Sequence, residues 1–274
     1  MPVTTTTALC GIVLHPAGHT RSPAMHNAAY AALGLDALYL AFDVPEPRLA
    51  DAMAGVRGLG IRQLSVSIPH KIRVLDLVDV VDETAGRIGA ANTVVLQDGR
   101  LVASNTDWLG AIRALERERS LSGTSAVVLG AGGTARSVVW GLIDRGAVVR
   151  VLNRSVPRAE ALARELGAEG AGSLESLAST PYDVLVNATS VGMAGDTSPI
   201  PAAAIRPQAV VLDAVYAPEH TRLLRDAHAR GARVVSGRWM LIHQAVAQLE
   251  AWAGPIDMKL AANVMANAFE PQPA

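Results

Sequence analysis

Residues 125–135 read Ser-Ala-Val-Val-Leu-Gly-Ala-Gly-Gly-Thr-Ala, an apolar run that ends in a cluster of glycines. The apolar run predicts a buried strand, and a helical pattern follows it at residues 135–144. Gly130, Gly132 and Ala135 match the G-x-G-x-x-A fingerprint of a dinucleotide-binding turn, in which a pyrophosphate lies at the start of the helix. A tight loop alone would carry the same glycines, but here strand, loop, helix and next strand follow in order. The residues expected to contact the dinucleotide are Gly130, Ala131, Gly132, Gly133, Thr134 and Ala135.

The end of the next expected strand, residues 147–152, indicates which dinucleotide is bound. NAD sites usually place Asp or Glu there to bind the ribose 2′-hydroxyl, and the segment 153–158 contains neither. Arginine instead suits a 2′-phosphate, which it binds through paired hydrogen bonds. NADP is therefore favoured, although Arg158 on a solvated helix face is the alternative. The residues expected at this position are Asn153, Arg154, Ser155 and Arg158.

A polar segment, Asn187-Ala188-Thr189-Ser190, follows a third expected strand at residues 184–186. Polar groups at the carboxyl ends of strands in such a sheet face the ligand crevice, so we expect Asn187, Thr189 and Ser190 to contact the cofactor. A turn rich in small residues is the alternative interpretation.

Strand-like and helix-like runs alternate along the whole chain, which predicts an α/β fold with mainly parallel sheets. The pattern restarts near residues 104–107, where we place a boundary between two units. Strands are expected at residues 9–14, 37–42, 63–68, 93–97, 101–103, 125–129, 147–152, 184–186, 210–212 and 233–235. Helices are expected at residues 22–33, 47–55, 70–77, 107–119, 135–144, 158–166, 220–230 and 240–252. Asp98-Gly99 predicts a hairpin turn, and the last helices are expected to fold back on the first unit, since alone they would have little to bury against.

The composition excludes several classes of protein. Half of the 274 residues are hydrophobic and 18% are charged, so the chain can bury a sizeable core. A formal net charge of -1 argues against a generally basic nucleic-acid binder, and the single cysteine, Cys10, excludes an intrachain disulfide framework. No apolar run suits a membrane span and residues 1–7 lack a signal-peptide pattern, so a cytoplasmic protein is expected. His15 and His19 do not share a helix face, and no metal site is expected.

Residues 65–71 read Ser-Val-Ser-Ile-Pro-His-Lys and predict a strand that runs into the start of a helix, with Ser65 and Ser67 on one face. Lys71 is one of only two lysines in a chain rich in arginine, and lysine is the basic side chain that can lose its proton when buried. Asp107 ends a second polar cluster. Lys71 and Asp107 together would suit proton transfer on a small polyhydroxylated substrate, while a surface lysine and a helix-capping aspartate are the alternatives.

Together these motifs resemble the shikimate dehydrogenase family. The segments that carry the resemblance occur in the family's order and span nearly the whole chain: His19-Thr20-Arg21-Ser22-Pro23, Ser67-Ile68-Pro69-His70-Lys71, Ala91-Asn92-Thr93, Asn105-Thr106-Asp107, Gly130-Ala131-Gly132-Gly133, Asn153-Arg154-Ser155, Asn187-Ala188-Thr189-Ser190 and residues 237–244. The resemblance implies a reversible, NADP-dependent reduction of 3-dehydroshikimate to shikimate, in the chorismate pathway of aromatic amino acid biosynthesis. It also implies a substrate-binding catalytic domain (1–104 plus 238–274), a Rossmann-type NADP domain (105–237) and a cleft between them.

The resemblance also assigns a role to each candidate in the substrate site. Lys71 and Asp107 would flank the reacting hydroxyl and handle its proton. Thr20 and Ser22 would bind the substrate carboxylate, helped by Tyr216. The remaining residues are Ser67, Asn92 and Gln244 for the ring hydroxyls and Gly237, through its backbone, for the nicotinamide.

Several positions depart from the family's usual residues. Ser65 and Ser67 stand where the family usually has Asn and Thr, and bulky Trp108 and Trp239 stand at positions that are usually small. These changes keep two functions open beside the main one: a shikimate dehydrogenase-like paralogue acting on quinate, aminoshikimate or another cyclic hydroxy acid, and a non-catalytic NADP-binding regulatory protein. The expected partner is a cyclic polyhydroxy carboxylate rather than nucleic acid or a membrane, and the expected state is a monomer or homodimer.

Overall fold

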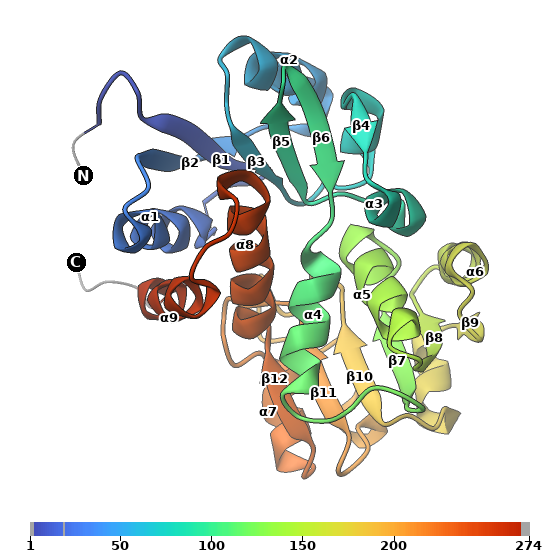
Figure 1. The fold of residues 1–274 in the computed structure, drawn as a ribbon. Helices are drawn as coiled ribbons and strands as arrows, with labels where there is room; N and C mark the ends of the chain where they lie inside the picture. The colour runs from blue at the N-terminus through green and yellow to red at the C-terminus, as the bar shows by residue number, and fades with distance from the viewer. Residues whose placement is uncertain (1–2, 19, 270–274) are drawn as a thin grey trace. The chain divides into compact units, whose positions relative to one another are not determined.

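The structure is a computed structural model that describes residues 3–18 and 20–269 (Figure 1). The chain forms two compact units, each with a six-stranded sheet. The first unit contains the described residues up to Thr106 and those from Gln244 onward, and the second contains Asp107–His243. His19, one of the residues that carry the family resemblance, lies outside the described residues.

The sheet of the first unit is part parallel and part antiparallel. Its strands are β1 (Ala8–Leu14), β2 (Ala37–Asp43), β3 (Gln63–Val66), β4 (Val80–Val81), β5 (Thr93–Gln97) and β6 (Arg100–Ser104). Their order is β2-β1-β3-β5-β6-β4, with β1 parallel to both neighbours and β5 antiparallel to β3 and β6. Asp98 and Gly99 have φ values of 49° and 76°, the left-handed values of a tight hairpin turn, so the predicted turn is confirmed.

Helices cover the sheet of the first unit. They are α1 (Ser22–Leu33), α2 (Leu49–Gly58), α3 (Glu83–Ile88), the later turns of α8 (Gly237–Ala253) and α9 (Met258–Phe269), with short 3-10 helices η1 (Glu46–Arg48) and η2 (Arg73–Leu77). α1 has a proline in its first turn and Gly34 in the left-handed conformation at its end, which are the usual start and stop signals of a helix. α9 packs against α1, and Val13, Leu64 and Met53 share the core beneath α2.

The sheet of the second unit is wholly parallel. Its strands are β7 (Ser125–Leu129), β8 (Val148–Leu152), β9 (Gly170–Gly172), β10 (Val184–Asn187), β11 (Val210–Asp213) and β12 (Arg233–Ser236). The order β9-β8-β7-β10-β11-β12 is the Rossmann order. Successive strands are added on one side of β7 up to β9, and then on its other side from β10 to β12. The α/β class with a Rossmann-type unit is therefore confirmed.

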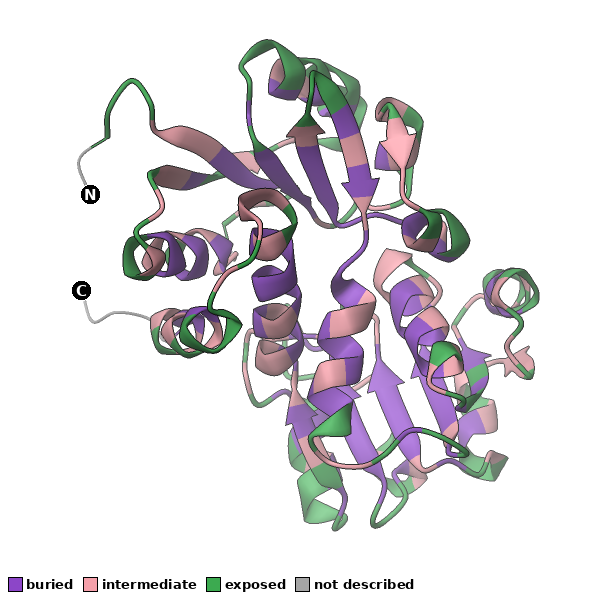
Figure 2. Cartoon of the chain, viewed as in Figure 1, coloured by how far each residue is buried: buried purple, intermediate pink, exposed green. Residues whose placement is uncertain are grey.

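Both faces of this second sheet are covered. Val128 enters one hydrophobic cluster, whereas its neighbours Val127 and Leu129 enter another, because strand side chains alternate between faces. The central strands β7, β10 and β11 are accordingly buried along most of their length, whereas the edge strands β9 and β12 are largely half-buried (Figure 2). The helices of this unit are α4 (Asp107–Glu116), α5 (Gly133–Asp144), α6 (Val156–Leu166) and α7 (Arg222–Ala229), with 3-10 helices η3 (Leu174–Ser179) and η4 (Ala202–Ala204).

The predicted helix at residues 70–77 is wrong. Turns lead instead into the short 3-10 helix η2. The reason is a long-range hydrogen bond: the Ala91 N–H donates to the Lys71 carbonyl at 2.8 Å, and this is the carbonyl that an α-helix would pair with Leu75. Leu75 donates to Ile72 instead, at 3.3 Å.

Other differences from the expected pattern are smaller. The helix expected at 47–55 is preceded by a 3-10 turn and runs from Leu49 to Gly58. β4, β9 and α3 were not predicted, because segments of two to six residues show no hydrophobic period.

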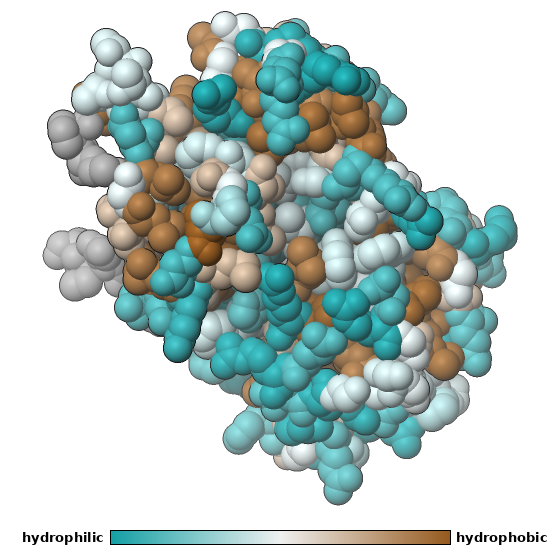
Figure 3. All heavy atoms as spheres, viewed as in Figure 1, coloured by the Kyte–Doolittle hydropathy of each residue, from teal (hydrophilic) through white to brown (hydrophobic). Residues whose placement is uncertain are grey.

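No described helix is both long enough and apolar enough to cross a membrane. In the view of Figure 3, hydrophilic side chains cover much of the second unit's visible face, with scattered hydrophobic ones between them.

Candidate functional site

The predicted dinucleotide-binding turn follows β7 and leads into α5. Gly130 has a φ of 112°, which favours glycine. A Cβ atom there would lie 3.1 Å from Thr189 Cγ2 and 3.2 Å from the Ala188 carbonyl oxygen. The Gly130 N–H donates to the Leu152 carbonyl of β8 at 2.8 Å. The structure thus brings the glycine turn and the polar segment 187–190 together.

The rest of the turn exposes backbone at the start of a helix. Gly132 precedes the 12-residue helix α5 and is exposed, and no atom lies within 4 Å of the place where its Cβ would be. Ala135 is fully buried, so the helix starts close against the sheet. The first N–H groups of a helix lack helical partners and carry partial positive charge. Open backbone beside such a terminus fits a pyrophosphate. The other predicted contacts in this turn, all partly buried, are Ala131, Gly133 and Thr134.

The segment after β8 fits a phosphate group that is separate from the pyrophosphate. Asn153 Nδ2 donates to the Ser155 carbonyl at 3.1 Å, and Ser155 precedes the first turn of α6. Arg154 and Arg158 are exposed, and neither forms an ion pair with another residue of the described chain. Two guanidinium groups without an acidic partner at this edge suit the 2′-phosphate of NADP rather than the bare ribose of NAD.

Asn187 is fully buried at the end of β10 and organises the residues that follow it. Its Oδ1 accepts from the Thr189 N–H at 3.1 Å and from the Thr189 hydroxyl at 2.7 Å. Its Nδ2 donates to Asp213 Oδ1 at 2.9 Å and to the Val191 carbonyl at 3.2 Å. Asn187 therefore fixes the loop of residues 188–191. Thr189 of this loop lies against Gly130, and Ser190 is exposed.

Asp213 was not singled out in the sequence, yet it fixes the loop that carries Tyr216. Its carboxylate accepts from the Val215 N–H at 3.0 Å and from the Thr221 hydroxyl at 2.6 Å. Burial nevertheless raises the pKa of Asp213 to about 6. Gly237 lies against the same loop, since a Cβ there would come within 2.6 to 2.8 Å of three backbone carbonyl oxygens. The structure thus brings Gly237 close to the loop of half-buried Tyr216.

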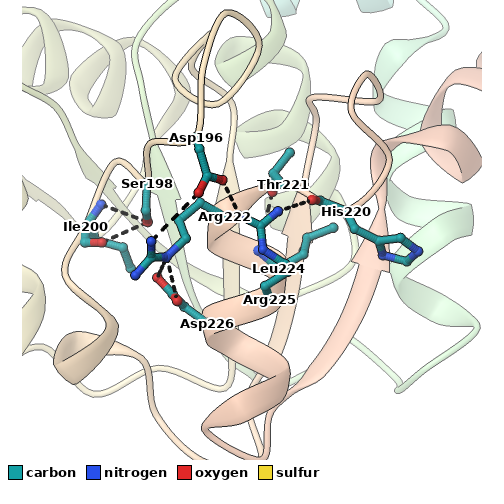
Figure 4. A network of polar contacts seen from close by, with 9 residues as sticks. All are labelled: Asp196, Ser198, Ile200, His220, Thr221, Arg222, Leu224, Arg225 and Asp226. Carbon is teal, nitrogen blue, oxygen red and sulfur yellow. Dashed lines mark hydrogen bonds and ion pairs between the residues drawn. The ribbon is translucent and has the colours of Figure 1, made fainter.

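An exposed set of ion pairs fastens the loop beyond Ser190 to α7 (Figure 4). Asp196 pairs with Arg225 and, at 3.9 Å, with Arg222. Arg225 also donates to the His220 carbonyl at 2.7 Å, and Arg222 pairs with Asp226 at 2.9 Å. Exposed pairs of this kind contribute little stability singly, so the network adds contacts between residue 196 and α7 without being a large source of stability.

In the first unit, Asn92 and Gln244 lie together in a buried polar cluster. Asn92 Nδ2 donates to Gln244 Oε1 and to the Thr106 hydroxyl, each at 3.0 Å. Asn92 Oδ1 accepts from the Thr106 N–H at 2.8 Å and from the Thr93 hydroxyl at 2.9 Å. Two predicted ring-binding residues far apart in the sequence are therefore neighbours.

Ser67 and Lys71 lie on the turns that follow β3, and both are partly buried. The Ser67 N–H donates to the Val13 carbonyl at 2.9 Å. His70, between them, is fully buried, and its Nε2 bonds to the Val44 carbonyl at 2.8 Å. Burial lowers the pKa of His70. The backbone carrying Lys71 is therefore held in place by long-range contacts, including the bond from Ala91 to its carbonyl.

Thr20 and Ser22 lie at the start of α1. The Ser22 N–H donates to the Thr20 hydroxyl oxygen at 3.3 Å, which brings the two predicted carboxylate-binding residues together. Ser22 is 5% exposed. The N-terminus of a helix favours an anion, so this arrangement fits a carboxylate.

Asp107 belongs to the second unit, where it is the first residue of α4 and is 4% exposed. A carboxylate at that position is stabilised by the helix dipole.

Trp108 packs within the same unit, with its ring centroid 4.8 Å from that of Trp140 at an edge-on angle. Trp239 lies beneath Arg117, whose Cζ is 4.0 Å from the ring centroid. Both departures from the family pattern thus have packing roles.

Gln248 and Tyr39 also contact the substrate candidates or their neighbours, and the sequence patterns did not indicate either of them. Gln248 Nε2 donates to the Asn92 carbonyl at 2.8 Å, and Gln248 Oε1 accepts from the Ser65 hydroxyl at 2.9 Å. Gln248 lies one helical turn after Gln244, and that spacing was the available signal. Tyr39 donates to Ser65 at 2.6 Å, and nothing in the sequence links these two strands.

Across residues 3–18 and 20–269, no group of three His, Cys, Asp or Glu side chains is arranged to hold a metal ion.

Comparisons with known proteins agree on one family. A family model for the shikimate dehydrogenase substrate-binding domain matches residues 12–94, and a model for shikimate / quinate 5-dehydrogenase matches residues 113–194. A shikimate dehydrogenase (NADP(+)) from Haloarcula marismortui is 48% identical over 253 residues, which cover 90% of this chain and 95% of the relative.

Solved structures give the same result. Shikimate 5-dehydrogenase from Thermus thermophilus, in complex with NADP(H) and shikimate, is 38% identical with a TM-score of 0.87, over 95% of this chain and 99% of its own. The 5-ketofructose reductase of a Gluconobacter strain is 33% identical with a TM-score of 0.83, over 96% and 99%. Since family models and full-length relatives agree with the motifs in order and position, the chain belongs to the shikimate dehydrogenase family.

Proposed function

We propose that this chain is an NADP-dependent oxidoreductase that interconverts 3-dehydroshikimate and shikimate by hydride transfer. The observation that carries the proposal is the buried hydrogen bond of 3.0 Å between Asn92 and Gln244, which joins two family motifs 152 residues apart. Curated relatives named shikimate dehydrogenase (NADP(+)) support it at 48% and 44% identity. The Thermus relative, solved with both NADP(H) and shikimate, supports the choice of cofactor and substrate.

The substrate groups are bound by the first unit, with Tyr216 added from the second. Thr20 and Ser22 bind the carboxylate at the start of α1, where the helix terminus favours negative charge. The amides of Asn92 and Gln244 hold ring hydroxyls together with the hydroxyl of Ser67. Thr93, Thr106 and Gln244 fix the Asn92 amide in one orientation, and the amide holds a ring hydroxyl by exchanging one of these bonds, such as that to Gln244, for a bond to the substrate.

Lys71 and Asp107 handle the proton. When shikimate is oxidised, its reacting carbon loses a hydride and the hydroxyl on that carbon loses a proton to this pair. NADP⁺, when bound, supplies the hydride acceptor. The burial of Asp107 and the fixed backbone around Lys71 hold both groups in position, and such positioning supplies much of a catalytic rate.

The cofactor is held by the second unit. The turn 130–135 takes the pyrophosphate, and Arg154 and Arg158, beside Asn153 and Ser155, take the 2′-phosphate. Asn187, Thr189 and Ser190 border the turn, and the Gly237 backbone meets the nicotinamide. A cytoplasmic location and a monomeric or homodimeric state stay predictions from the sequence.

The test compares Lys71→Ala with Lys259→Ala, since these are the chain's two lysines and Lys259 is exposed on α9. Reduction of NADP⁺ is followed with shikimate, and with quinate, aminoshikimate and NAD⁺ in parallel. We expect wild-type turnover with shikimate and NADP⁺, a kcat for Lys71→Ala lower by about 10²- to 10⁴-fold, and an unchanged Lys259→Ala. NADP⁺ affinity should be equal in all three. The absence of shikimate turnover by the wild-type enzyme overturns the proposal. A kcat of Lys71→Ala equal to that of the wild type shows that Lys71 does not take part in the reaction.

A further inference from the structure

Strand β2 lies at one edge of the first unit's sheet, and within the described chain it pairs with β1 alone. It is seven residues long, and residues 37–42, Ala-Leu-Tyr-Leu-Ala-Phe, carry no charge. The other edge strands are shorter: β4 has two residues, β9 has three, and β12 has four and begins with exposed Arg233. Short length and charged residues usually protect a sheet edge from pairing with another chain. Strand β2 has neither protection over residues 37–42.

Alternate residues of β2 turn their backbone groups toward β1 and away from it. The Val44 N–H donates to the Leu14 carbonyl of β1 at 3.0 Å, and the Ala8 N–H of β1 donates to the Asp36 carbonyl at 2.9 Å. The even-numbered residues of β2 therefore face β1. The odd-numbered residues present their N–H and carbonyl groups at the open edge, and they are Ala37, Tyr39, Ala41 and Asp43.

The first half of this open edge is already covered. The Ala37 N–H donates to the Leu35 carbonyl at 2.9 Å. The Asn27 side chain of α1 accepts from the Tyr39 N–H at 2.8 Å and donates to the Tyr39 carbonyl at 2.9 Å, as a neighbouring strand would. Ala41 and Asp43 are exposed, and no residue in 3–18 or 20–269 accepts a hydrogen bond from the N–H of either one. The part of the edge that is open to another chain is therefore short.

One antiparallel register between two copies of the chain uses these two residues and none that is covered. When Phe42 of one copy lies opposite Phe42 of the other, Ala41 of each copy lies opposite Asp43 of the other. Each such pair exchanges both of its N–H to carbonyl bonds. A centre at Ala41 would set Asp43 against Tyr39, whose backbone groups are already bonded. A centre at Asp43 would set Ala41 against Pro45, which has no N–H.

The same register also matches the side chains of the two copies. On one face, Leu40 of each copy lies opposite Val44 of the other, and the two Phe42 side chains are neighbours. Phe42 and Val44 lie at the margin of the core beneath α2, and Leu40 is 40% exposed, so the contact covers apolar surface that is open to water. On the other face, small Ala41 leaves room for Asp43. Apolar residues thus meet apolar ones, which favours a second copy of this chain as the partner.

We propose that β2 is an interaction surface for a second copy of this chain, with the two β2 strands paired antiparallel across a two-fold axis at Phe42. The sheets of the two first units then form one continuous sheet, and the contact is closed because both copies use the same surface. The two Asp43 carboxylates lie diagonally across the pair, and each keeps its contact with His15 of its own chain, 2.7 Å from Nδ1 to Oδ1. The inference does not depend on the proposed function, since it uses no substrate or cofactor contact.

The first test compares two leucines of matched exposure. Leu40→Lys puts a charge inside the proposed contact, and Leu260→Lys puts one on α9, where the leucine is 39% exposed. In analytical ultracentrifugation we expect the wild type to be a dimer at micromolar concentrations. Leu40→Lys should raise the dissociation constant of the dimer at least about tenfold, because a charge replaces an apolar contact, and Leu260→Lys should leave it unchanged. A monomeric wild type overturns the inference, and so does a Leu40→Lys dimer as stable as that of the wild type.

Ala41→Pro is the second variant, and it decides the matter if circular dichroism shows that Leu40→Lys is misfolded. It removes an N–H that points away from β1, so the hydrogen bonds between β1 and β2 stay, and proline is tolerated at such edge positions. We expect the dissociation constant of the dimer to rise by at least about tenfold again, through loss of backbone hydrogen bonds between the copies. An unchanged constant overturns the inference.

Cross-linking tests the register itself. Residue 42 is the one that lies opposite its own copy, so Phe42→Cys should form an intermolecular disulfide under oxidation by copper phenanthroline, because opposed Cα atoms lie within the range of about 4.4–6.8 Å that a disulfide allows. In Leu40→Cys the two thiols would be separated by roughly 13 Å along the strands and should not react. Cys10, the chain's own cysteine, is fully buried. No cross-link in Phe42→Cys, or an equal one in Leu40→Cys, overturns the proposed pairing.

Discussion

The nucleotide turn of the second unit and the polar cluster of the first unit are built from different parts of the chain. At the turn, the backbone makes the site: Gly130 takes a φ closed to most residues and Gly132 leaves open space at a helix terminus. In the cluster, side chains make the site: Asn92 is oriented by Thr93, Thr106 and Gln244. The first kind of site depends on glycines, which have no side chain to fill the space. The second kind depends on a full set of hydrogen-bond partners.

This difference determines how each region responds to substitution. A backbone site should tolerate changes in nearby polar side chains and reject an added methyl group. A side-chain site should lose several hydrogen bonds together when one member is removed, because buried polar groups left without partners are costly.

We expect the largest effect from Asn92→Ala. The substitution leaves buried polar groups of Thr93, Thr106 and Gln244 short of a partner, and each such group costs about 1–3 kcal/mol, so the free energy of unfolding should fall by about 4 kcal/mol. Chemical denaturation measures it. The matched variant in the nucleotide region is Asn153→Ala, which breaks one bond of 3.1 Å to the Ser155 carbonyl and should cost under about 1 kcal/mol. Equal losses in the two variants would contradict the comparison.

The next largest effect separates two glycines of one turn. Gly130→Ala places a methyl group at a φ of 112° against Thr189 and Ala188, and should lower the free energy of unfolding by about 2 kcal/mol. Gly132→Ala meets no atom within 4 Å and should change stability by less than about 0.5 kcal/mol. It should still weaken NADP⁺ binding about tenfold, because the methyl group occupies the space of the pyrophosphate. Denaturation and NADP⁺ titration of both variants measure this, and unchanged binding in Gly132→Ala argues against the pyrophosphate there.

Acid should weaken the first unit through His26. Burial lowers the pKa of His26 to about 3, whereas a histidine in an unfolded chain has a pKa of about 6.5. Below that value the unfolded chain binds a proton that the folded chain does not bind, so stability falls as the pH falls, by about 2 kcal/mol at pH 5. His26→Phe should remove this loss between pH 7 and pH 5. His228→Gln, at an exposed position, is the control, and a wild-type-like pH dependence in His26→Phe would rule His26 out as the cause.

The smallest effect concerns the choice of cofactor. Arg158→Ala should raise the KM for NADP⁺ about tenfold through loss of a charged hydrogen bond to the 2′-phosphate, and should leave the KM for NAD⁺ unchanged. Arg164→Ala, an exposed arginine on the same helix, should change neither. Equal effects on the two cofactors would place Arg158 away from the 2′-phosphate.

The sequence predicted the backbone-built region better than the side-chain-built one. The glycine turn and the Asp98-Gly99 hairpin are local, because a few adjacent residues fix the conformation. The helix expected at residues 70–77 failed, since a hydrogen bond from distant Ala91 occupies the Lys71 carbonyl. The bond between Ser65 and Gln248 spans 183 residues, and no spacing rule reaches that far. A local pattern could still have indicated Gln248, because it lies one helical turn after Gln244.

The split layout of the first unit has a consequence for the newborn chain. The second unit has all its residues before Gln244 and Gln248 are synthesised, whereas Ser65 and Asn92 are made early in translation and lack those partners until then. Domains fold as units while the ribosome is still working, so the part of the chain made first is completed last. Until α8 is made, Ser65 of β3 and Asn92, the residue before β5, lack their final partners. We expect this interval, before Gln244 and Gln248 are available, to be when the protein depends most on chaperones.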